Sequence, residues 1–213
     1  MIRLFTTAHC RSSLPRCMRR AWGILFFLIS PHTLATANSY FIFNHLNPNT
    51  MNTLLINIFF SLLVFTAAYS WLVKPLLPRL MPSTVLIPIL LLHSLRHLGL
   101  MFLTTGVTSN SMPAQFAIPA AAGDFLSATL AFIAAFLIHR KSTWAMPMTW
   151  IFSVVGIADF AMAVVLSRVY NAADFMGGAY WIPSFWVPML IVGHIIVITV
   201  LRQMKRDGMS FSR

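Results

Sequence analysis

Five long apolar runs constrain the fold of this chain more than any other feature of the sequence. They cover residues 52–73, 82–105, 113–139, 147–167 and 181–201. A helix needs about 20 apolar residues to cross the hydrocarbon core of a bilayer, and each run is long enough. In lipid, each segment must satisfy its own backbone N–H and C=O groups, which favours helices. The sequence predicts an all-α fold, a polytopic transmembrane bundle of five spans.

The charged residues agree with this fold class. Asp, Glu, Lys and Arg make up only 9% of the 213 residues, and Glu is absent, whereas soluble domains carry about a quarter. The formal charge of +11 raises the question of nucleic acid binding. However, Lys and Arg cluster at the ends of the apolar runs instead of gathering on one face, which is the distribution of a membrane protein. We therefore expect the lipid bilayer as a partner and no nucleic acid.

The basic residues also predict an orientation. Lys74 and Arg79 follow the first run, Arg140 and Lys141 follow the third, and a basic tail follows the fifth. The connections after the second and fourth runs are neutral or balanced. Because Lys and Arg are enriched in cytoplasmic loops, the C-terminus is predicted to be cytoplasmic and the start of the first span to face outward.

The first 50 residues differ from the rest. They begin with an Arg-rich stretch without acids, continue with a short apolar run at residues 22–29, and reach the small residues Ala35-Thr36-Ala37. This layout is typical of a signal peptide, and the short run is otherwise a sixth apolar segment. A second hypothesis is that Met51 is the true start. On either hypothesis we expect residues 1–37 to be absent from the mature protein.

The predicted organisation therefore has three parts. Residues 1–50 form a basic, signal-like arm, residues 51–203 a five-helix membrane domain, and residues 204–213 a basic cytoplasmic tail. Cys10 and Cys17 both lie in the arm, where their spacing indicates neither a zinc site nor a disulfide framework.

The second apolar run contains an unusual group of ionisable residues. His93, Arg96 and His97 stand at positions i, i+3 and i+4, which places them on one face of an α-helix. A charge in hydrocarbon is costly, so such residues face a protein interior or a wet cavity and are candidates for function.

Three other runs carry an ionisable residue at a comparable position. Each follows the proline at the start of its run by 11 or 12 residues, as His93 follows Pro82; the others are Asp124, Asp159 and His194. Eleven helical residues rise about 16 Å, roughly half of the hydrocarbon core, so all four are predicted to lie near one depth. Since like charges disfavour ionisation, we expect Arg96, a protonated histidine or a bound cation between the two aspartates.

Several motifs in these runs resemble a known family. They are His93…Arg96…Gly99-Leu100, Phe116 to Asp124, Gly156…Asp159, and Tyr180-Trp181-Ile182-Pro183…His194. The pattern resembles a family of small, uncharacterised bacterial integral membrane proteins over roughly residues 51–200. The resemblance implies a multi-pass protein of the bacterial inner membrane and implies no activity.

Three hypotheses for function remain open from the sequence. In the first, the candidate site transports protons, an ion or a small solute, because Asp and His titrate and line wet paths. Arg96 then holds an anionic group or serves as a fixed counter-charge, and the small number of spans favours a homodimer. No residue is singled out as catalytic, and no cofactor is assigned.

The second hypothesis is a metal- or haem-binding redox protein. Its metal ligands would be His93, Asp124, Asp159 and His194, and the two histidines would be the axial ligands of a haem. In the third hypothesis these residues only hold helices together, with Arg96 paired to an aspartate and each histidine donating to a carbonyl.

Overall fold

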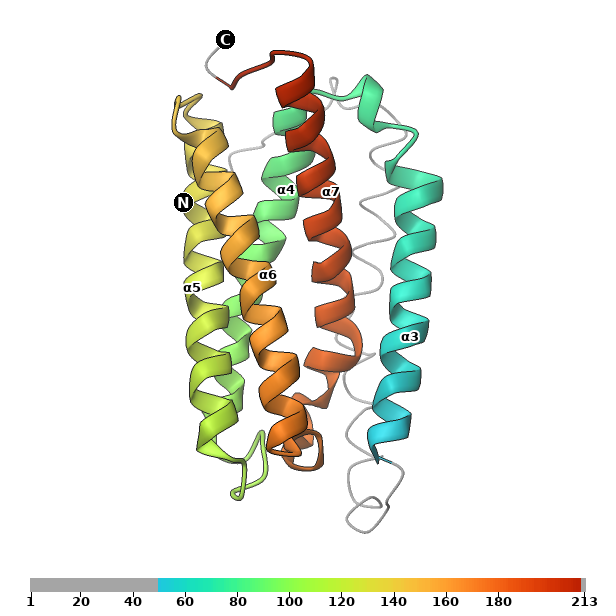
Figure 1. Ribbon diagram of the computed structural model, residues 1–213, viewed down its shortest axis with the longest axis vertical. Coiled ribbons are helices and arrows are strands. Elements are labelled where there is room, and N and C mark those ends of the chain that lie inside the picture. The colour runs from blue at the N-terminus through green and yellow to red at the C-terminus, as the bar shows by residue number, and fades with distance from the viewer. Residues whose placement is uncertain (1–49, 212–213) are drawn as a thin grey trace, which may run out of the picture. The chain divides into compact units, whose positions relative to one another are not determined.

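Helices form the regular structure of the chain throughout residues 50–211, the part that the computed structural model describes. Five helical stretches in this part are long and apolar enough to cross a membrane (Figure 1). Their principal helices are α3 (Thr50–Ala68), α4 (Pro82–Ser94), α5 (Ala114–His139), α6 (Ala145–Val169) and α7 (Val187–Arg206). The predicted all-α bundle of five spans is confirmed. The N-terminal arm lies outside the described residues.

Short irregular helices extend three of the spans. A π-helical turn, Tyr69–Val73, continues α3, and a second one, Ile182–Trp186, precedes α7. A nine-residue 3-10 helix, Leu95–Leu103, continues α4. At the junction with α4, the Ser94 hydroxyl donates to the carbonyl of Leu90 at 2.9 Å, a bond that competes with the regular helix. The second span is therefore not one α-helix, and a 3-10 stretch of this length is uncommon.

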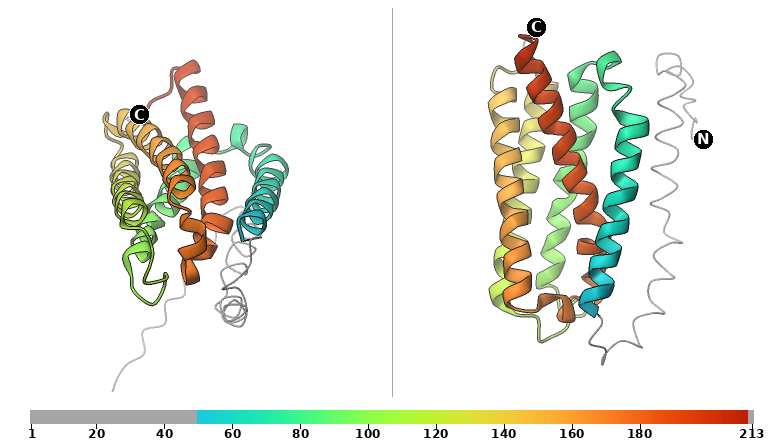
Figure 2. Two further views of the ribbon diagram at one scale, coloured as in Figure 1. Left: turned by 60° about the horizontal axis from the view of Figure 1, so that its bottom comes forward. Right: turned by 45° about the vertical axis from the view of Figure 1, so that its right-hand side comes forward.

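Four spans form the body of the bundle and the first packs outside it. α5 lies between α6 and the second span, and α7 contacts both α4 and α6. α3 packs on α7 and the segments near the start of α7 (Figure 2). The most apolar window of the first span is not buried by the described part of the chain. An exposed apolar helix is what a lipid-facing span requires. The first span therefore packs outside the four spans that carry the ionisable residues.

The apolar interior is divided into two clusters along the bundle. One includes Leu90, Phe152 and Val197, and the other includes Phe102 and Leu190. Ionisable residues of the spans fall near the boundary between these clusters in sequence, for example Asp124 between Ala120 and Ala131. The polar residues thus interrupt the core at mid-length, as the spacing from the prolines predicts.

The connections gather at two ends of the bundle. Residues 104–113 and 170–180 meet at one end, where the Gly178 N–H donates to the carbonyl of Val107 at 2.6 Å and the Ser109 N–H to that of Phe175 at 2.9 Å. The connections with Lys74, Arg79, Arg140 and Lys141, and the C-terminal tail, share the opposite end (Figure 1). The five spans therefore bring the basic segments together, and the side of the membrane on which they lie stays a prediction.

Candidate functional site

Arg96 is the centre of the polar interior. The 3-10 helix Leu95–Leu103 carries it, and only 1% of its surface is exposed. Its Nε donates to Oδ1 of Asp124 at 2.8 Å, and its Nη2 donates to Oδ2 of Asp159. Its guanidinium carbon lies 3.9 Å from the centre of the Phe160 ring, a cation–π contact. The expectation of a cation between the two aspartates is confirmed, and Arg96 is that cation.

Two histidines lie beside this ion-pair group. His93 and His194 are 0% and 2% exposed, and their ring centroids are 4.4 Å apart. Phe152 contacts both rings, stacking on His194 at 4.9 Å between centroids. None of the four imidazole nitrogens has a hydrogen-bond partner in the described part of the chain. The structural hypothesis expects each histidine to donate to a carbonyl, and neither does.

Each of the four titratable side chains lies against a glycine of a neighbouring span. A Cβ on Gly193 would stand 2.6 Å from Nε2 of His93, and one on Gly156 would stand 2.8 Å from His194. A Cβ on Gly99 or Gly123 would collide with a carboxylate. The contacts are Asp124 on Gly99, Asp159 on Gly123, His194 on Gly156 and His93 on Gly193.

These four contacts form a closed circuit through the bundle. Each of the second to fifth spans supplies one glycine and one titratable side chain. Each side chain meets the glycine of the span before it in the chain, and His93 of the second span closes the circuit on the glycine of the fifth. We call His93, Arg96, Asp124, Asp159 and His194 the polar ring. Small residues let helices approach closely in membranes. Here they also leave the space that the ring side chains fill.

The close contacts of the four glycines with the ring side chains are what sequence reasoning missed. Gly123 directly precedes Asp124, and Gly193 directly precedes His194. That adjacency is visible in the sequence, but it does not say which neighbouring helix the glycine serves. The contact is made with a side chain from a different span in every case.

His97 lies outside the ring, although the sequence predicts that it shares one helix face with His93 and Arg96. Its side chain is exposed, and its Nδ1 lies 3.0 Å from the carbonyl oxygen of Ser94. The reason is the change of helix type after Ser94. A 3-10 helix repeats every three residues, so Arg96 stays in line with His93 while the next residue turns away.

The ring does not form the metal or haem site that the second hypothesis describes. Within residues 50–211, no group of three or more His, Cys, Asp or Glu side chains is placed to hold a metal ion. Arg96 occupies the position between Asp124 and Asp159 that a metal cation would take. The imidazoles of His93 and His194 contact each other, which leaves no room for a macrocycle between them.

Comparison with known proteins places the chain in a family. A family model described as a domain of unknown function (DUF8737) matches residues 53–202. The chain belongs to this family. The matched segment contains the whole polar ring and its four glycines, and the predicted membership of an uncharacterised family is confirmed. No curated protein and no solved structure matches the chain.

Proposed function

We propose that this membrane protein moves protons across the bilayer through the polar ring. The observation that carries the proposal is the pairing of two features at one depth. A buried arginine is held by carboxylates from two other spans, and beside it lie two histidines with four unpartnered ring nitrogens. Ionisable residues within membrane spans are costly and mark proton relays and ion pathways.

The charge of the ring supports proton binding. Arg96 remains charged in a protein, and with both carboxylates ionised the group carries a net charge of one negative unit. An uncompensated charge is expensive to bury, so the ring is most stable when it also holds one proton. That proton has two carboxylates and two imidazoles on which to reside.

The histidine pair supports proton transfer within the ring. A neutral imidazole has one donor and one acceptor nitrogen, so it can accept a proton on one side and release one on the other. Buried hydroxyls of Ser127 and Ser153 also lack partners in the part of the chain described here. They lie three residues from Asp124 and Gly156, about one helical turn towards the basic end of the bundle. We assign them to a route from the ring to that end.

A purely structural role is the competing proposal, and the ion pairs of Arg96 favour it. They join the second, third and fourth spans at one point. A structural role does not require the imidazoles of His93 and His194, because their nitrogens form no hydrogen bond to another helix in the described part of the chain. The two proposals therefore differ in what removal of the imidazoles does.

Proton flux into liposomes tests the proposed function. The full chain is reconstituted with an internal pH dye, and a potassium gradient with valinomycin sets the membrane potential. We expect proton flux above that of protein-free liposomes, and we expect the double variant His93→Phe/His194→Phe to lose it. Phenylalanine preserves the aromatic contacts with Phe152 and removes all four imidazole nitrogens.

His97→Phe is the matched control, because His97 lies on the same span outside the ring and is exposed. It should conduct as the unmodified protein does. Equal flux in the double variant and the unmodified protein would rule out the histidines as the route.

The setting of this activity is also part of the proposal. The family resemblance and the basic loops support the inner membrane of a bacterium, with the C-terminus in the cytoplasm. In this arrangement residues 51–203 form the conducting domain, residues 204–213 a cytoplasmic tail, and residues 1–50 a signal-like arm. The small number of spans supports a homodimer.

A further inference from the structure

Two helices at the basic end finish with the same backbone turn but with different residues. At the end of α7, Gly208 has a φ of 63°, and the Met209 N–H donates to the carbonyl of Met204 at 2.9 Å. At the end of α5, Lys141 has a φ of 51°, and the next N–H donates five residues back at 3.0 Å. This left-handed position normally favours glycine. A lysine in this conformation lowers the stability of the turn. Its presence there suggests that the lysine side chain has a role of its own.

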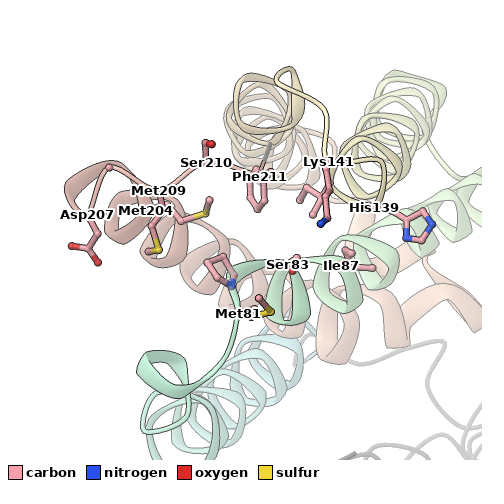
Figure 3. Close-up of a pocket in the computed structure, with 13 residues that line it drawn as sticks. Met81, Ser83, Ile87, His139, Lys141, Met204, Asp207, Met209, Ser210 and Phe211 are labelled. Carbon is pink, nitrogen blue, oxygen red and sulfur yellow. The ribbon is translucent and has the colours of Figure 1, made fainter. Parts of the chain in front are cut away.

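A pocket of about 550 Å³ lies beside this lysine. Its walls include Ser83 and Ile87 from the start of α4, His139 at the end of α5, and Phe211 of the tail. Figure 3 shows the Lys141 ammonium group between Phe211 and the residues of α4. The left-handed turn therefore directs the lysine into the pocket.

The tail completes the pocket. Gly208 reverses the chain after α7, which lets Phe211 return to the bundle, where it is 8% exposed within the apolar core. Asp207 is the acidic residue that lines this pocket, and its carboxylate accepts a bond from Arg206 at 3.2 Å. Its charge is thus compensated by its neighbour, and the charge of Lys141 remains available to a ligand.

The lining combines two kinds of surface. Met81, Ile87 and Phe211 are apolar, whereas Lys141, His139 and Ser83 are polar and include a full positive charge. The pocket lies at the end of the spans, the level at which lipid headgroups sit. Lysine binds phosphate as a point charge, and basic pockets between membrane helices on the cytoplasmic side bind anionic headgroups.

We propose that this pocket binds the phosphate headgroup of an anionic phospholipid, with Lys141 as the main contact. The apolar wall accommodates the part of the lipid next to the headgroup. The residues that line this pocket include no member of the polar ring. The proposal therefore does not depend on proton transport through the ring.

Thermal unfolding of the full chain with defined lipids tests the proposal. Phosphatidylglycerol is expected to raise the melting temperature by about 3 °C more than phosphatidylcholine. Lys141→Gly should lose this difference without unfolding, because glycine suits the left-handed turn and should raise the melting temperature of the lipid-free protein. Lys141→Arg should keep at least half of the difference. Arg202→Gln, which removes a charge near the same end but outside this pocket, should keep all of it.

Three results would overturn the proposal. The first is an equal response to both lipids, and the second is an unchanged lipid difference in Lys141→Gly. The third is a shift of the same size with millimolar inorganic phosphate alone, which would assign the pocket to a free anion. Native mass spectrometry gives an independent readout, with phosphatidylglycerol retained by the unmodified protein and by Arg202→Gln and lost from Lys141→Gly.

Discussion

Replacing Arg96 by methionine should cost about 3–5 kcal/mol of folding free energy, because breaking a buried ion pair leaves uncompensated charge. The side chain of Arg96 is fully buried, and its guanidinium compensates the carboxylates of Asp124 and Asp159 together. Methionine has a similar length and fills most of the space, so the loss reports the charge and its hydrogen bonds. Chemical denaturation of the purified protein in detergent measures it.

The triple variant Arg96→Met/Asp124→Asn/Asp159→Asn should regain most of this stability, since no charge remains in the ring. Arg206→Met is the matched control, because Arg206 pairs with Asp207 at the surface with its side chain 77% exposed. It should change stability by about 0.5 kcal/mol at most. Arg96→Met with the stability of the unmodified protein would contradict the geometry of the ring.

Adding one methyl group at Gly123 should cost about 3 kcal/mol, the upper range for overpacking in a tight interior. The new Cβ would collide with the carboxylate of Asp159, which Arg96 holds in place. An aspartate side chain is too short to withdraw without giving up that ion pair. Gly123→Ala is therefore expected to unfold at a lower denaturant concentration and to lose proton flux.

A double-mutant cycle separates this collision from a general intolerance of the helix. In an Asp159→Ala background the obstacle is gone, so Gly123→Ala should cost less than about 1 kcal/mol, a clear departure from additivity. Ala122→Val is the matched control at the neighbouring, exposed position of the same helix and should be nearly neutral. Equal costs of Gly123→Ala in both backgrounds would show that the collision with Asp159 is not the cause.

The spans and the depth of the ring could be predicted because they depend on local properties. A run such as residues 113–139 is apolar over more than the thickness of a bilayer, and few other structures accommodate it. The rise per residue then places Asp124 and His194 at mid-span from their positions in the sequence. The presence of a positive charge between the two aspartates could be predicted because like charges at close range disfavour ionisation.

Two kinds of feature could not be predicted. The first is local: His97 was expected on the same face as Arg96, but the α-helical period does not continue past Ser94. The second depends on which spans are neighbours. The contact of Gly123 with Asp159 needs the third span to lie beside the fourth in one register. No local pattern specifies that register. The pocket at the basic end likewise needs the tail to turn back at Gly208.

Asp124→Asn tests the central claim most directly, because it removes one charge from the ring and little else. Asp124 is the most exposed ring member, with 15% of its side chain accessible, and asparagine can still accept the bond from Nε of Arg96. The remaining pair of Arg96 and Asp159 is neutral, so the ring no longer needs a proton. We predict a melting temperature within about 3 °C of the unmodified protein, a change of about 1 kcal/mol or less, and proton flux reduced to that of protein-free liposomes. A folded Asp124→Asn protein that conducts protons at the unmodified rate would contradict the account and leave the ring a structural tie between helices.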